Sequence, residues 1–174
     1  MISMIYAPLL WAITLYFSFG DLKMQASLAP TYENAFCNPT VLANQVFYED
    51  TLVYALYTHK PVVEGHCLII PKRPVIRFEE LSDDETLQIA QTIKKVDQAV
   101  RQAYGTRDYF LLQKNGSDAG QTVPHVHFHY VPKKPGDSSS FILLIRAIAA
   151  QALGPISQKN MDEVRETLSY HMNN

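Results

Sequence analysis

The chain has 174 residues, of which 47% are hydrophobic and 18% charged, a composition ordinary for a single folded domain. Its formal net charge of −2 excludes the broad basic surface of nucleic-acid-binding proteins, so no nucleic-acid partner is expected. An anionic ligand must therefore be held by a local site and not by the field of the whole protein.

The first twenty residues, MISMIYAPLLWAITLYFSFG, contain no charged side chain. Their length suits a membrane span, but a secretion signal needs positive charge ahead of its apolar core, and SLAP offers a poor cleavage site. Three interpretations of residues 1–30 stay open: a dispensable extension with Met24 as the true start, an export or anchor segment, and an extra element packed on the domain. We expect a cytoplasmic protein, with membrane contact through residues 1–20 as the alternative.

The first regular elements of the domain are short strands. Residues 45–48 and 51–58 are rich in β-branched and aromatic side chains and flank the dipeptide ED, a pattern typical of a β-hairpin. After a loop that contains Pro and Gly, the run CLIIP at 67–71 predicts a buried strand.

A change of period then marks one long helix that ends before Gly105. Ser82 and Glu85 form a capping box at its start. Apolar residues recur on one helical stripe, at Ile89, Ile93, Val96, Val100 and Ala103. Asp83, Asp84 and Glu85 favour the positive end of the helix dipole. We therefore interpret these three as a solvated acidic cap without a catalytic role.

The second half of the chain adds two strands and a tail. The segments are a strand DYFLLQ at 108–113, a loop KNGSDAGQT at 114–122, a strand HVHFHYV at 125–131, a loop KKPGDSSS at 133–140, and helices at 141–153 and 160–171. Short connections favour antiparallel pairing. The expected fold class is α+β: a five-stranded antiparallel sheet with one long helix, in a domain at 31–137, followed by a helical tail at 138–174.

Three histidines occupy alternate positions of the last predicted strand, at His125, His127 and His129. Alternate side chains of a strand share one face, so the three imidazoles are expected to point together while the intervening Val, Phe and Tyr face the core. Three interpretations are open. The histidines are solvated surface residues, or a zinc site, or the centre of chemistry on phosphate, in which an imidazole attacks phosphorus and forms a covalent intermediate.

The loop before the histidines favours the phosphate interpretation. Gly116 and Gly120 allow backbone N–H groups to turn toward an anion, and Ser117, Gln121 and Thr122 bring side chains that donate to phosphate oxygens. A short Gly-Ser loop alone is a common turn. Directly before three histidines on one face it is a stronger signal.

The segment GQTVPHVHFHYVPKK resembles the signature of the histidine-triad family, His-x-His-x-His with apolar residues between. KPVVEGHCLIIPKRPVIRFEEL is similar to the family's second landmark, a Gly-His followed by an apolar strand and Pro-Lys/Arg. KPVV-x-GH, RPV-x-RF, AGQTV and PKKPGD resemble the fragile-histidine-triad (Fhit) branch. The resemblance covers residues 46–137. It implies the fold expected above, and a two-fold homodimer in which the sheets of two subunits join.

The resemblance also implies hydrolysis of dinucleoside polyphosphates, such as diadenosine triphosphate or tetraphosphate, to AMP and a second nucleotide. His127 matches the family's nucleophile, which carries AMP as a covalent nucleotidyl-imidazole until water displaces it. His125 and His129 match the histidines that polarise phosphate oxygens and help to protonate the leaving nucleotide. His66 matches a fourth histidine near the phosphates. Apolar walls for the base and ribose are expected from Leu56 and from either Ile69 or Ile70.

Gln121 and Thr122 match the donors of the family's phosphate loop, but two other positions depart from the pattern. The family often has Asp or Asn, which binds ribose hydroxyls, where Thr58 stands. Counted back from the nucleophile, the family's phosphate-side Asn or Gln falls on Lys114. Either Gln113 reaches the phosphates through a one-residue insertion, or Lys114 supplies a cation to them.

No tightly bound cofactor is expected, because no dedicated metal site is visible in the sequence and Mg²⁺ arrives with a polyphosphate substrate. Two alternatives to a dinucleoside polyphosphate hydrolase stay open. One is cleavage of AMP from an amine or a mixed anhydride, as in other branches of the family. The other is a nucleotide-binding dimer whose liganded state is the signal.

Overall fold

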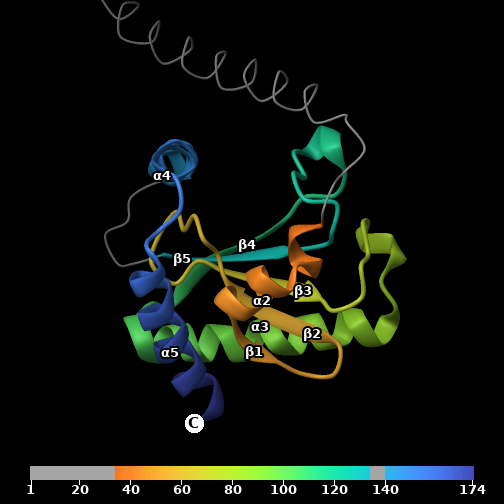
Figure 1. Cartoon of the computed structure of the whole chain (residues 1–174), viewed down its shortest axis with the longest axis horizontal. Coiled ribbons are helices and arrows are strands. Elements are labelled where there is room, and N and C mark those ends of the chain that lie inside the picture. Colours follow the sequence, from red (N-terminus) through yellow and green to blue (C-terminus); the bar gives the residue numbers. More distant parts are fainter. Residues whose placement is uncertain (1–33, 134–139) are drawn as a thin grey trace, which may run out of the picture. The chain divides into compact units, whose positions relative to one another are not determined.

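The computed structural model describes residues 34–133 and 140–174. Five strands form one antiparallel sheet in the order β1-β2-β3-β5-β4 (Figure 1). They are β1 Val46–Glu49, β2 Val53–Tyr57, β3 Cys67–Pro71, β4 Asp108–Gln113 and β5 Phe128–Lys133. The helices are η1 Ala35–Cys37, α2 Pro39–Gln45, η2 Phe78–Glu80, α3 Asp83–Tyr104, η3 Ser117–Ala119, α4 Ser140–Leu153 and α5 Gln158–Asn173. The expected α+β class with a five-stranded antiparallel sheet and one long helix is confirmed.

The long helix α3 begins and ends where its capping signals predict. The Ser82 side chain accepts a hydrogen bond from the Glu85 N–H, and Gly105 ends the helix with a φ of 66°. The prediction of a solvated cap is wrong for Glu85, which is 4% exposed. Its two carboxylate oxygens accept hydrogen bonds from Arg73, at 2.9 and 2.7 Å. The capping pattern reports only local contacts and gives no sign of a partner twelve residues earlier.

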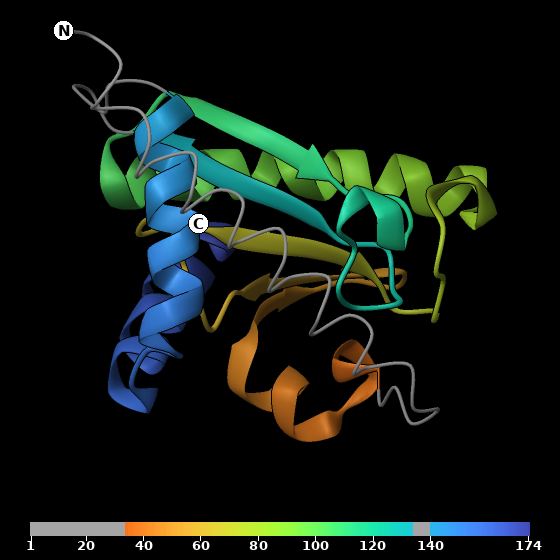
Figure 2. The same cartoon turned by 90° about the horizontal axis from the view of Figure 1, so that it is seen from above.

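The sheet is covered on both faces, by α3 on one side and by the segment 34–45 on the other (Figure 2). Alternation along β2 and β3 divides the apolar side chains between two clusters. Ala55 and Ile69 face α3, whereas Leu56 and Ile70 lie under Phe36 of the 34–45 segment. Ile69 therefore faces away from the histidines, and Leu56 and Ile70 are fully buried, so the expectation of ligand walls from these three is wrong.

The C-terminal helix α5 is part of the core and not a loose tail. Met161 is 4% exposed and Leu168 is fully buried in the cluster under the sheet, where α5 contacts α3 and β1. His171 lies within hydrogen-bonding distance of Gln102 on α3, at 3.1 Å. The apolar residues that face inward recur at helical spacing. This period is visible in the sequence and predicts a packed helix.

The last strand begins three residues later than predicted, at Phe128. Its pairing with β3 and β4 ends at Phe128, opposite Ile69 and Gln113. Upstream of this point the chain leaves the sheet, and Val126 donates its N–H to the carbonyl of Val75. His125 and His127 therefore lie on an irregular segment that enters the strand.

None of the helices in the described parts of the chain is long and apolar enough to cross a membrane. The three interpretations of residues 1–30 given above lie outside the described residues and stay predictions.

Candidate active site

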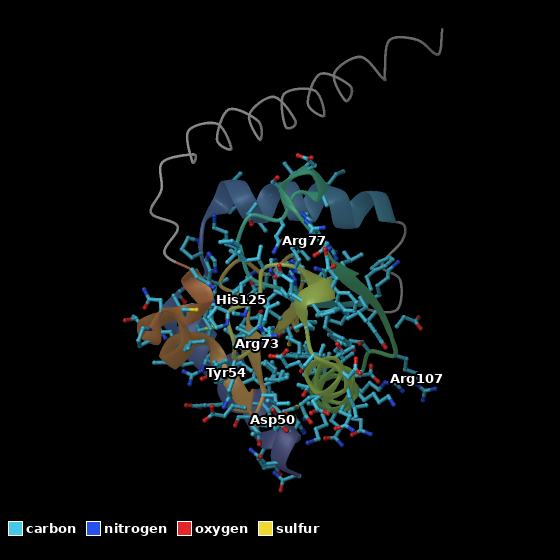
Figure 3. All side chains as sticks on the ribbon, turned by 90° about the vertical axis from the view of Figure 1, so that its right-hand side faces the viewer. Asp50, Tyr54, Arg73, Arg77, Arg107 and His125 are labelled. Carbon is cyan, nitrogen blue, oxygen red and sulfur yellow. The ribbon has the colours of Figure 1, made fainter. Side chains whose placement is uncertain are left out.

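His125 is fully buried beneath the 34–45 segment, where Figure 3 labels it in the interior beside the orange helices. Its Nε2 lies 2.9 Å from the Pro71 carbonyl, and its Nδ1 lies 2.8 Å from the Asn34 amide nitrogen. A carbonyl only accepts, so Nε2 bears the hydrogen and Nδ1 accepts from Asn34. Both ring nitrogens are thus occupied. The expected role of polarising phosphate oxygens does not fit this arrangement, in which His125 supports its neighbours.

His127 has one ring nitrogen in a hydrogen bond and one that is free. Its Nδ1 lies 2.7 Å from the His125 carbonyl and must donate to it, so the lone pair is on Nε2. In the described part of the chain, Thr106 Oγ1 is the one buried side-chain polar atom without a partner. The unpaired Nε2 of His127 is therefore open to solvent, although the side chain as a whole is 5% exposed.

His66, in the 59–66 loop, and His129, on β5, are hydrogen-bonded to each other. The Val62 N–H donates to Nδ1 of His66 at 3.3 Å, so Nε2 of His66 bears the hydrogen and donates to Nδ1 of His129 at 3.0 Å. This order leaves an N–H on Nε2 of His129. The ring centroids of His127 and His129 are 5.0 Å apart, so the ring with a free lone pair and the ring with a free N–H are neighbours.

Burial keeps all four imidazoles neutral at pH 7. Desolvation is the main cause that lowers the pKa of His66, to about 4, and that of His129, to about 3, with further lowering at His129 from its neighbours. Burial also lowers the pKa of His125 and of His127. The charge of Lys114 adds to the lowering at both His127 and His129.

The glycine loop before the histidines is held by the side chain of Gln121. Its Oε1 accepts from the Gly116 N–H at 2.7 Å, and its amide nitrogen donates to the carbonyls of Ile76 and His125, at 2.9 and 3.3 Å. Gln121 was expected to donate to phosphate. In this arrangement its side chain closes the loop and ties it to the carbonyl that fixes His127.

Of the two residues in question at the start of this loop, Lys114 is the one near the histidines. The Gln113 side chain turns back and donates to the Lys114 carbonyl at 2.9 Å. The Lys114 ammonium lies over Gly120, 3.5 Å from the place that a Cβ would take there.

The remaining expected residues differ in exposure. Thr122 is exposed at the end of the loop. Thr58 is 7% exposed, and its hydroxyl accepts from the Lys60 N–H at 3.5 Å. Its side chain is therefore buried at the start of the 59–66 loop.

Two residues of the site, Asn34 and Phe36, were not expected from the sequence. Asn34 caps η1 by accepting from the Phe36 N–H and so presents its amide nitrogen to His125. The Phe36 ring packs edge-on to His125 and His127, with centroids 5.6 and 5.4 Å away. The available signal was Asn38-Pro39, an N-cap followed by Pro at the first helical position, which predicts a short helix beside these residues.

A zinc site is not favoured by the geometry. In the described part of the chain, no group of three or more His, Cys, Asp or Glu side chains is arranged to hold a metal ion. The ring nitrogens of His66 and His125 are used in hydrogen bonds within the protein.

Comparison with known proteins places the chain in one family. The model of the family described as HIT domain matches residues 40–136. An asymmetrical bis(5'-nucleosyl)-tetraphosphatase of Schizosaccharomyces pombe is 38% identical over 98 residues, which cover 56% of this chain and 54% of that protein. A bifunctional bis(5'-adenosyl)-triphosphatase/adenylylsulfatase of Arabidopsis thaliana is 40% identical over 119 residues, which cover 68% of this chain and 66% of that protein. The chain thus spans about half to two thirds of the length of these relatives.

Two solved structures have a similar fold. The Caenorhabditis elegans NitFhit protein matches with a TM-score of 0.53 and 34% identity, over 64% of this chain and 27% of that chain. A histidine triad nucleotide-binding protein from Sulfolobus tokodaii matches with a TM-score of 0.64 and 24% identity, over 80% of this chain and 91% of that chain. The second likeness supports the fold alone.

Proposed function

The chain belongs to the family of proteins with a HIT domain, and from this premise we propose that it hydrolyses dinucleoside polyphosphates to AMP and a second nucleotide. The relatives from S. pombe and A. thaliana bear the names of a tetraphosphatase and a triphosphatase of such compounds. Diadenosine triphosphate and tetraphosphate are therefore the first substrates to test.

The observation that supports this proposal most directly is the hydrogen bond from Nδ1 of His127 to the His125 carbonyl. It directs the lone pair of Nε2 outward. In the proposed reaction Nε2 forms a bond to the α-phosphorus while the anhydride P–O bond breaks and its electron pair goes to the leaving nucleotide. The Nδ1–H remains bonded to the carbonyl, which stabilises the positive charge that develops on the ring. Water then displaces the imidazole and releases AMP.

His129 is the proposed donor to the leaving nucleotide, through the N–H that its bond with His66 leaves on Nε2. The free site keeps this ring neutral, but a bound polyphosphate brings negative charge beside it. Negative charge favours the protonated imidazole, so substrate binding should raise the pKa of His129. The His66–His129 pair would take up one proton from water, with Nδ1–H of His129 then donating to Nε2 of His66, and the Nε2 proton of the His129 imidazolium would pass to the leaving oxygen. Mg²⁺ would accompany the substrate and neutralise part of its charge.

We further propose that the protein is a cytoplasmic homodimer joined at β4, one of the two edge strands of the sheet. Three large apolar or aromatic side chains of this strand are substantially exposed: Tyr109 at 40%, Leu111 at 43% and Leu112 at 48%. An exposed apolar edge strand is the usual place for pairing with a second chain.

The direct test is His127→Asn. Asn retains polar volume but cannot form a nucleotidyl-imidazole, so turnover of diadenosine triphosphate should fall by several powers of ten while AMP still binds. His171→Asn, on α5, removes a histidine away from the site and is the matched control, with turnover expected to be unchanged. Retention of a tenth of the wild-type rate by His127→Asn would contradict the covalent role.

A further inference from the structure

Lys114 places a cation over the glycine loop. It is the first residue after β4, and its ammonium lies 3.5 Å from where a Cβ on Gly120 would be. Gly120 has a φ of 79° and leaves this space open. The side chain is exposed to solvent, and its charge acts on both His127 and His129. Lys114 is thus an exposed cation on the glycine loop, and its charge acts on the two histidines proposed to act on phosphate.

In the part of the chain that the structure describes, Lys114 has no carboxylate partner. Arg77, which approaches Gly116 on the same loop, is paired with Glu79. Figure 3 shows Arg77 beside this loop.

The imidazoles of the free site add no positive charge at neutral pH, since burial lowers the pKa of His66 to about 4 and that of His129 to about 3. A polyphosphate that enters the site therefore meets neutral rings and the charge of Lys114, which forms no ion pair within the described residues. Coulomb attraction grows with each added phosphate charge. The benefit from Lys114 must then depend on how many phosphates the substrate has.

We propose that Lys114 is a specificity-determining residue, which favours substrates whose leaving group carries phosphate over AMP conjugates whose leaving group is an uncharged amine or alcohol. This inference rests on the proposed function, since it names the substrate class of the same site. All such substrates share the single charge of the α-phosphate. Only the anhydrides bring further charge for Lys114 to attract, and a neutral glutamine at this position would not distinguish the two classes.

The experiment compares kcat/KM of the full chain with those of Lys114→Gln and Lys114→Arg, on diadenosine triphosphate and on adenosine 5'-phosphoramidate, whose leaving group is ammonia. For Lys114→Gln we expect a loss of tenfold or more on the anhydride and less than threefold on the phosphoramidate. Lys114→Arg should retain most of the selectivity. Lys94 is an exposed lysine on α3, and Lys94→Gln removes the same charge away from the site. This variant should change kcat/KM on neither substrate.

A second measurement separates this inference from the proposed function. Calorimetric titration with ATP and with AMP requires no turnover. The wild-type protein should bind ATP more tightly than AMP, more so at 50 mM than at 500 mM salt, and Lys114→Gln should lose most of that preference. Equal losses for both ligands, or equal kinetic losses on both substrates, would overturn the role of Lys114. Absence of anhydride cleavage by the wild type, with the ATP preference intact, would overturn only the proposed function.

Discussion

Lowering the pH from 7 to 5 should destabilise the folded protein through His66 and His129. In the folded state their pKa values are about 4 and about 3, against 6.5 for the ordinary side chain. The unfolded chain therefore takes up protons first as the pH falls. The stabilisation is fully present above pH 6.5 and is lost progressively below it. Each histidine should lower the free energy of unfolding by about 2 kcal/mol between pH 7 and pH 5.

This pH window isolates the histidines from the carboxylates. Bonds with Arg73 lower the pKa of Glu85 to about 2, from 4.5, so its contribution is lost only below pH 4.5. Urea unfolding at pH 7, 6 and 5 would measure the slope. In the double variant His66→Gln, His129→Gln, the slope should be much shallower, because Gln does not titrate.

The matched control is Leu168→Ala in α5. Removing this buried side chain should lower stability by about 2–5 kcal/mol at every pH and leave the slope as in the wild type. An unchanged slope in the double histidine variant, or a wild-type stability that does not fall between pH 7 and pH 5, would refute the claim that these rings are held neutral.

Two further predictions concern packing and assembly. Gly65→Ala should destabilise the fold by about 1–3 kcal/mol, since Gly65 has a φ of 84° and an added Cβ would lie 3.1 Å from Pro132. Gly105→Ala, where an added Cβ meets nothing within 4 Å, should cost less. Equal losses of stability in urea unfolding would contradict the close contact at Gly65. Leu111→Lys should shift the protein toward monomer, as measured by light scattering, because a charge on β4 opposes edge pairing. Leu87→Lys, on α3, should leave the oligomeric state unchanged. A Leu111→Lys variant that stays fully dimeric would count against a β4 interface.

Local patterns predicted most of the fold. The boundaries of α3 follow from Ser82, Glu85 and Gly105, which act through contacts with their immediate neighbours. The strands on either side of α3 follow from their apolar runs and the turns between them. Alternation placed the histidines on one side of the chain, and this holds although the strand itself starts only at Phe128.

The features that were missed depend on contacts between distant segments. His125 was expected at the phosphates, but Asn34, 91 residues earlier, occupies one of its nitrogens. The Arg73–Glu85 pair also joins two different elements. Such contacts depend on how elements dock, which spacing within one element does not encode. The packing of α5 is different, since its buried residues Met161 and Leu168 recur at a helical spacing that is visible in the sequence.

The side-chain amide of Gln121 forms three hydrogen bonds: with the Gly116 N–H of its own loop, with the Ile76 carbonyl, and with the His125 carbonyl that orients His127. A loop fastened in this way is in place before a ligand arrives. Binding therefore has little conformational entropy to lose at this point, and association should proceed without a slow closing step. Differences in affinity between related nucleotides would then come mainly from their dissociation rates, while their association rates would be similar.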